Sequence, residues 1–285
     1  MTTLFRRVSD VVIGPLRVTG LRVQFQVERD LLPRPNRAEI RIYNLSKKHQ
    51  AELEAFDARR QVPVRLEAGY QGAVSQLYHG DLRYVRWERE GPQVVAIVSS
   101  GDGLASFRSS RTSRSFAPGT PVADVLRFLA ENLGVGLGNL DKALGGKLSG
   151  NLRVFTGGTV VSGQTADELR RLLDAVGLEH SIQDGALQVI PKGGALEGTA
   201  VKLSASTGLV GSPSINTPAG FGGSVFAPPR EVTCSSKLHP DIVPGRLVQL
   251  ESEFISGLFR TFRVEYRGDT HGADWHSNLV LRFAR

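Results

Sequence analysis

Polar and apolar residues alternate along much of the first hundred residues of the chain. The alternating stretches are residues 21–27, 37–45, 62–70 and 77–85, and a nearly continuous apolar run follows at 93–98. A period of two predicts strands with one buried face and one face in water. A short polar segment, residues 46–58, predicts a helix between two of these strands. Five or six strands in sequence-adjacent order favour an antiparallel barrel or sandwich over a parallel sheet.

The period changes between residues 105 and 198. Thr120 followed by proline predicts the start of one helix, with Thr120 as its N-cap. Thr165 and Glu168 have the spacing of a capping box and predict a second helix. Apolar residues recur along one face of each helix, and each is followed by glycine. A hairpin is predicted around the Asp-Gly turn at 184–185, so this segment is expected to be a small α+β domain.

Alternation returns in the last third of the chain. Residues 209–223 are low in charge and rich in Gly, Ser and Pro, and we expect a long loop there that orders on assembly as an interface arm. Four strands are predicted at residues 230–236, 246–252, 257–266 and 276–283. The predicted fold is mainly β. Two antiparallel barrel or sandwich domains, residues 1–104 and 199–285, flank an α+β insert, residues 105–198.

Composition adds limits to this picture. The 285 residues are 40% hydrophobic and 22% charged, which is ordinary for a globular protein with two or three domains. The single cysteine, Cys234, excludes an internal disulfide framework and is predicted to be a buried strand residue. No stretch approaches the roughly 20 apolar residues of a helical membrane span. The N-terminal residues lack the apolar region of a secretory signal, so we expect synthesis and folding in a reducing cytoplasm.

The net charge of +7 and the pI of about 9.8 raise the question of nucleic-acid binding. Lys and Arg exceed Asp and Glu by 16 to 12 in residues 1–105, by 10 to 9 in 106–199 and by 9 to 7 in 200–285, so the excess is spread. The densest basic run, residues 108–114, is flanked by serines and has no interleaved aromatic residue. A solvated loop or an inter-subunit contact is therefore favoured over a phosphate-contacting loop.

The sequence contains no phosphate-binding loop, no nucleophile elbow and no His-Glu-x-x-His zinc motif. The best candidate constellation is His271, Asp274 and His276, whose spacing could serve a metal. A polar turn with Trp275 packed inward fits this spacing equally well and is favoured. His239, beside a proline, is interpreted as a loop residue.

Acidic residues give no stronger indication of an active site. Glu251 and Glu253 are expected to share a strand face, as a catalytic carboxylate pair could, but a solvated face is the simpler interpretation. Asp102 lies in a glycine-rich stretch and is interpreted as a turn former. We therefore assign no catalytic, cofactor-binding or metal-binding residue, predict no cofactor and expect no enzyme activity.

Several of these segments resemble one family. Residues 36–46, 66–70 and 79–80 are similar to the opening β domain of phage tail baseplate hub proteins of the late-control protein D type and of related injection machines. Residues 238–250 resemble the strand, Pro-Gly turn and strand of the second hub barrel, and residues 266–275 resemble its closing hairpin. The resemblance extends over most of the chain as a pattern of strands and turns.

The resemblance implies a structural role in the virion, in the tail baseplate. It implies a homotrimer in which two tube-like barrels per subunit present six similar domains around an axis, which would join a hexameric tail tube above to a trimeric spike below. Other baseplate proteins would be further partners, and DNA would pass only in transit through the lumen. The insert would decorate the exterior; it has no aromatic groove for glycan, since Trp87 and Trp275 both lie outside it.

Two other functions remain open at this point. One is a tail-tip peptidoglycan hydrolase or cell-wall-binding tail protein, which as a hydrolase needs a carboxylate pair or a metal site. The other is a nucleic-acid-binding module, whose binding would weaken steeply as salt rises.

Overall fold

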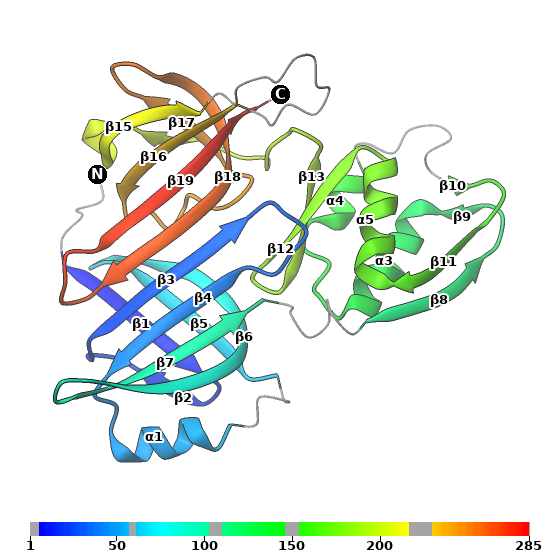
Figure 1. Cartoon of the computed structure of the whole chain (residues 1–285). Coiled ribbons are helices and arrows are strands. Elements are labelled where there is room, and N and C mark those ends of the chain that lie inside the picture. Colours follow the sequence, from blue (N-terminus) through cyan, green and yellow to red (C-terminus); the bar gives the residue numbers. More distant parts are fainter. Residues whose placement is uncertain (1–5, 57–60, 103–109, 146–153, 217–229, 285) are drawn as a thin grey trace. The chain divides into compact units, whose positions relative to one another are not determined.

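The computed structural model describes residues 6–56, 61–102, 110–145, 154–216 and 230–284 (Figure 1). The chain divides into two compact units. The sheet unit consists of Met1–Asp30, Arg37–Ser100 and Gly194–Arg285, and the insert unit consists of Leu31–Asn36 and Gly101–Gly193. None of the helices in these ranges is long and apolar enough to cross a membrane.

The sheet unit is built on one sheet of 13 strands, counted over the described residues. In spatial order the main path is β15 (Leu209–Asn216), β16 (Glu231–Lys237), β19 (Trp275–Phe283), β18 (Ser256–Asp269), β3 (Val23–Asp30), β4 (Arg37–Tyr43), β7 (Gln93–Gly101), β6 (Ala73–Glu90), β5 (Pro63–Tyr70), β1 (Arg7–Ile13) and β2 (Leu16–Val18). β17 (Leu247–Glu251) pairs with β18, and β14 (Val201–Leu203) pairs in parallel with β17. The predicted mainly β fold with a large antiparallel sheet is confirmed.

Local sequence explains several of these elements. Along β3 and β4 the buried residues occupy every second position, as the alternation predicts. β4 ends at Asn44, which adopts a positive φ of 56°, a conformation that Asn tolerates better than most residues. Helix α1 (Lys47–Glu54) then begins with Ser46 as N-cap, whose hydroxyl accepts a hydrogen bond of 3.2 Å from the backbone N–H of His49. A short 3₁₀ helix, η2 (Ala205–Thr207), lies between β14 and β15.

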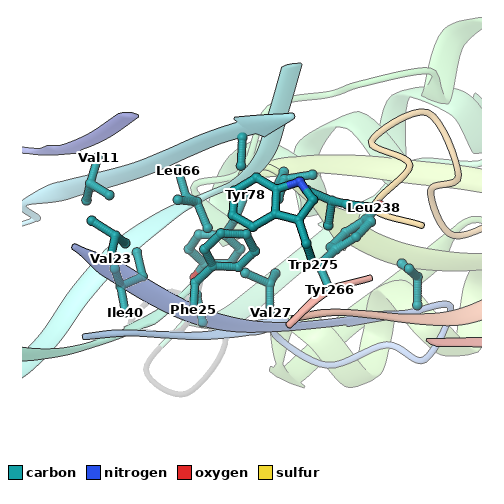
Figure 2. Close-up of a cluster of buried hydrophobic side chains, with 14 of the residues drawn as sticks. Val11, Val23, Phe25, Val27, Ile40, Leu66, Tyr78, Leu238, Tyr266 and Trp275 are labelled. Atoms are coloured by element: carbon teal, nitrogen blue, oxygen red, sulfur yellow. The ribbon is translucent and has the colours of Figure 1, made fainter. Parts of the chain in front are cut away.

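Most apolar side chains of the sheet form one core (Figure 2), and Tyr43, Val95 and Ile97 of β4 and β7 form a separate small cluster. Val11 and Leu66, from β1 and β5, face Val23 and Ile40, from β3 and β4, across the interior. The same core continues into the last third of the chain, where Tyr266, Trp275 and other large side chains are buried. Removing such side chains from water contributes roughly 1.5–3 kcal/mol for each large one.

Strands β3 and β18 join the two ends of the chain within this sheet. They pair antiparallel over seven residues, from Arg263 opposite Asp30 to Asp269 opposite Gln24. Tyr266 lies opposite Val27 and is fully buried, and its hydroxyl donates a 2.7 Å hydrogen bond to the carbonyl of Ile242. The strands of residues 7–101 and those of residues 201–283 therefore share one sheet and one core.

A side chain bridges strands that do not pair. The Arg7 guanidinium, from β1, donates hydrogen bonds to the carbonyl of Asp269 at the end of β18, at 3.0 Å, and to that of Ala273 in the turn between β18 and β19, at 3.1 Å. It also lies 5.5 Å from the centre of the Trp275 ring. β1 is thereby linked to the β18–β19 turn by hydrogen bonds from a side chain.

The insert unit has its own core between helices and hairpins. Its helices are α3 (Val122–Leu133), α4 (Leu140–Gly145) and α5 (Thr165–Ala175), and its strand pairs are β8 (Arg111–Phe116) with β11 (Thr159–Gln164), β9 (Thr120–Pro121) with β10 (Val154–Phe155), and β12 (Leu178–Gln183) with β13 (Ala186–Pro191). The predicted Asp184-Gly185 hairpin is confirmed, with positive φ at both turn residues.

Both predicted helix caps in this unit are wrong. The N-cap of α3 is Pro121, and the Thr120 hydroxyl instead donates to the carbonyl of Ala117 at 2.7 Å. The N-cap of α5 is Gln164, so Thr165 is already helical. Its hydroxyl accepts hydrogen bonds from Ser110 and Asn132, at 2.8 and 3.0 Å. The Thr120 hydroxyl is therefore used by the preceding turn, and that of Thr165 by partners distant in sequence.

Two predicted loops are also corrected. Residues 209–216 form strand β15, which pairs with β16 and accommodates its Gly and Pro through a register shift between Val210 and Ser214. The rest of the expected loop, 217–223, lies outside the described residues. In the basic run, Arg111 and Arg114 belong to strand β8, and the Arg114 guanidinium lies 4.6 Å from the centre of the Phe128 ring. Arg108 lies outside the described residues.

Candidate functional site

The sheet face opposite the core is polar where β18, β3 and β4 meet. We call it the polar face and define it by nine residues: Arg37, Glu39 and Arg41 on β4, Gln24, Gln26 and Glu28 on β3, and Glu265, Arg267 and Asp269 on β18. They alternate along each strand with residues of the core, so all nine side chains lie on one side.

The strand registers place these residues in three rows. Arg41 lies opposite Gln24 and Gln24 opposite Asp269; Glu39, Gln26 and Arg267 form the second row; Arg37, Glu28 and Glu265 form the third. The sign of the charge therefore alternates along β4 and along β18, and the two strands are opposite in sign in every row. Between neighbouring strands, the opposite charges of Arg37 and Glu28 stabilise the sheet modestly, and the like charges of Glu28 and Glu265 oppose this.

Glu265 links three strands of this face. Its carboxylate accepts hydrogen bonds from Arg267 at 2.8 Å, from Gln26 on β3 at 2.6 Å and from Asn278 on β19 at 3.0 Å. Burial alone would raise the pKa of Glu265, but these hydrogen bonds outweigh it, so the pKa lies below its ordinary value. The carboxylate therefore stays charged and fixes the relative positions of β3, β18 and β19.

Asp269 has the same role at the other end of the face. Its carboxylate accepts hydrogen bonds from Arg22 and Gln24, both at 2.8 Å, and from the backbone N–H of His271, also at 2.8 Å. Burial opposes the charged form, but these donors prevail and the pKa of Asp269 is strongly lowered. The first β3 residues and the β18–β19 turn are thereby held together.

Three hollows lie along this side of the sheet. One of about 180 Å³ is lined by Gln24, Glu39 and Asp269 among others. A second, of about 280 Å³, extends toward β6 and includes Arg83 and Tyr84. A third, of about 520 Å³, extends toward β15 and is lined by both polar and apolar groups of β15, β16, β18 and β19, among them Ser214, Thr233 and Asn278. The polar side of the sheet thus continues well beyond its nine defining residues.

Of the histidine constellation predicted from the sequence, His271 and Asp274 lie in the β18–β19 turn and His276 lies on β19. The Nδ1 atom of His271 lies 2.9 Å from the Thr270 hydroxyl, and that of His276 lies 3.9 Å from the Asp274 carboxylate. Trp275 is 5% exposed and packs inward, as predicted. Across the described residues, no group of three or more His, Cys, Asp and Glu side chains could hold a metal ion.

The carboxylate pair on one strand face is not present. β17 ends at Glu251, and Glu253 lies in the turn that follows, so the two do not share a strand face. Glu251 forms an ion pair with Lys202 at 2.9 Å. His239 lies in a loop, as predicted, and partial burial lowers the pKa of its imidazole.

Two other single residues are buried. Asp102 lies at a turn and its carboxylate accepts hydrogen bonds from the backbone N–H and the side-chain amide of Asn36, at 2.6 and 2.9 Å. Cys234 is on β16 and 7% exposed, which confirms the prediction of a buried strand residue, and burial raises the pKa of its thiol to about 12. Neither group has the setting of a nucleophile or a general base.

The polar face itself was not identified from the sequence. Its signal is the reversal of charge sign at every second residue in Arg37-Ala-Glu-Ile-Arg41 and in Glu265-Tyr-Arg-Gly-Asp269. That these two segments lie on either side of one strand depends on the pairing of β3 with β18, which no local pattern reveals.

Comparisons with known proteins show which solved structures share this fold. No protein-family model matches the chain, and no curated protein matches it in sequence. Among solved structures, a tail protein from Neisseria meningitidis MC58 matches with a TM-score of 0.66 and 13% identity over 98% of this chain and 97% of its own. The 43 kDa tail protein of prophage MuSo2 from Shewanella oneidensis matches with a TM-score of 0.65 and 9% identity over 98% of both chains.

A third match extends the fold beyond phages. The E. coli c3393 protein, a component of the type VI secretion system described as structurally similar to the T4 bacteriophage tail proteins gp27 and gp5, matches with a TM-score of 0.62 and 10% identity. The alignment covers 96% of this chain and 77% of that one. The chain therefore has the fold of phage tail proteins and of a type VI secretion component, and its resemblance to phage tail hub proteins is confirmed at the level of the fold.

Proposed function

We propose that the protein is the structural baseplate hub of a phage tail or of a phage-derived tail. Three copies form a pseudo-sixfold ring, with tube-like modules from residues 1–104 and 199–285 of each copy, and the ring joins the hexameric tail tube to the trimeric central spike. The α+β segment lies outside the ring. This role requires no enzyme activity and no cofactor.

The observation that supports this proposal most directly is the match of almost the entire chain to two tail proteins, which leaves little of the chain for another role. The sheet has the surfaces that such a ring needs. One face is a continuous apolar core, and the other is a polar face to which both ends of the chain contribute. In the ring, the polar face lines the channel through which DNA passes.

The proposal is tested by the mass of the purified protein. Light scattering after size-exclusion chromatography is expected to give three times the 30.9 kDa of one chain, alone or after addition of the spike protein. Electron microscopy of that fraction is expected to show threefold rings. A protein that stays monomeric alone and with both the spike and the tube proteins contradicts the proposal.

A further inference from the structure

The polar face has almost no net charge although the whole chain has a charge of +7. Its cations are Arg37, Arg41 and Arg267, and each lies in a row that ends in a carboxylate on the far strand. Glu28 adds one further negative charge on β3. The excess positive charge of the protein therefore lies elsewhere on its surface.

The spacing of these charges limits the reach of their field. Charges of like sign recur every four residues along a strand, a distance of roughly 13 Å. Above a surface of alternating charge the potential decays over the period divided by 2π, here roughly 2 Å, which is much shorter than the Debye length of about 8 Å in physiological salt. A polyanion a few ångströms above this face experiences almost no attraction.

Two of the three arginines, Arg41 and Arg267, are also held in contact with carboxylates. Both Nε and Nη2 of Arg267 donate to one oxygen of Glu265, at 2.9 and 2.8 Å. Arg41 pairs with Glu90 and, at 3.4 Å, with Glu88, both on β6. A guanidinium held in this way would have to leave its carboxylate to bind a phosphate, and so binds it weakly.

We propose that the carboxylates of the polar face prevent its arginines from binding nucleic-acid phosphate, so that a DNA duplex passes over this face without being held. The physiological use of this property rests on the proposed function, since only a channel lining requires it. The surface property belongs to each single chain and is measurable whether or not the ring forms.

The test removes the negative charges and keeps the arginines. The triple variant Glu28→Gln, Glu39→Gln, Glu265→Gln leaves Arg37 and Arg267 without opposing charge on their rows. A matched control, Glu54→Gln, Glu131→Gln, Glu253→Gln, makes the same change in net charge at exposed positions that do not belong to this face. Binding of a fluorescent 12-base-pair DNA duplex is followed by anisotropy over a range of salt concentrations.

We expect the triple variant to bind the duplex at least tenfold more tightly than the control at low salt. Two additional phosphate contacts steepen the slope of log K against log salt by about 1.8. Adding Arg37→Gln and Arg267→Gln to the triple variant should abolish the gain, which shows that the freed arginines cause it. Thermal melting and circular dichroism confirm that each variant is folded.

Two outcomes overturn the inference. One is a folded triple variant that binds DNA no more tightly than the control. The other is a wild-type protein that already binds the duplex tightly and loses that binding on Arg37→Gln and Arg267→Gln. If the wild-type protein is monomeric and the triple variant shows the expected gain, the inference about this face stands and only the ring is contradicted.

Discussion

The two units of this chain are stabilised in different ways. In the sheet unit the central pair of strands, β3 and β18, comes from opposite ends of the chain, so its core exists only when both ends are folded. The insert unit draws its core from one continuous segment, Gly101–Gly193, for example from helix α5 and the β12–β13 hairpin that follows it. The sheet unit is therefore expected to unfold as a whole, and the insert unit to be stable or unstable largely on its own.

Their polar groups differ as well. The sheet unit places ionised groups on an accessible face and pairs them with one another. The insert unit instead buries an imidazole, His180 on β12, which is 4% exposed and whose Nε2 has no hydrogen-bond partner among the described residues. The first arrangement tolerates acid until its carboxylates protonate, whereas the second becomes unfavourable as soon as the imidazole gains a proton.

The largest loss of stability is expected from a change in the β3–β18 pair, which joins the two ends of the chain. Tyr266→Ala removes a fully buried ring and its hydrogen bond, and should cost about 3–5 kcal/mol of unfolding free energy. Hydrogen exchange read by mass spectrometry should show the loss in β3 and β4 as well as in β18, with the insert unit unchanged. The matched variant Leu169→Ala in α5 should reverse this pattern. Equal loss of protection in both units from either change would contradict the distinction between them.

Mild acid should affect the insert unit first. Burial lowers the pKa of His180 to about 4 from an ordinary value of 6.5, with nearby Asp174 opposing this and Arg170 reinforcing it. The unfolded chain therefore binds the proton more readily, and stability is lost as the pH falls from 6.5 to about 4, by about 3 kcal/mol in total. His180→Leu should remove this pH dependence in denaturation curves of the insert unit.

The sheet unit provides the control for that experiment. Its His239 also has a lowered pKa but is less completely buried, so His239→Gln should leave the acid sensitivity of the insert unit intact. The lowered pKa of Asp269 means that its contribution is complete above its ordinary value of 3.8 and is lost only as the pH falls below that value. Loss of both units in one step near pH 6 would contradict this order.

A smaller effect is expected where Gly268 of β18 packs against the ring of Phe25 on β3. A Cβ atom added at Gly268 would lie 2.2 Å from the Phe25 ring, so Gly268→Ala should cost about 1–3 kcal/mol through displacement of that ring. Gly157→Ala in the insert unit meets nothing within 4 Å and should be nearly neutral. Urea denaturation compares the two. Equal costs would show that packing at the junction is looser than the structure indicates.

Sequence patterns predicted the elements whose stability is local. Strand β4 and the β12–β13 hairpin follow from alternation and from turn chemistry at Asn44 and Asp184. β15 was missed because its pairing with β16 outweighs a composition typical of loops. The capping box at Thr165 failed because Ser110 and Asn132 compete for its hydroxyl.

The polar face could not be predicted from the sequence, because it too depends on pairing between distant segments. The alternation of charge along each strand is visible in the sequence, but the register between strands is a tertiary property. A shift of one residue in the pairing of β3 with β18 would move every charge to the other face of the sheet. Only the observed register places Glu265 beside Gln26 and Asn278 and gives each row opposite charges at its two ends, on β4 and β18.

The most direct test of the account is whether the polar face lines a closed channel. Gln26→Cys places a thiol on that face, Lys48→Cys places one on exposed helix α1, and the native Cys234 is buried with a thiol pKa of about 12, so it reacts little. In the ring assembled with spike and tube proteins, a bulky maleimide–polyethylene glycol should label Lys48→Cys rapidly and Gln26→Cys very slowly, while both react alike after disassembly. Equal labelling of the two positions in the assembled ring would contradict the account.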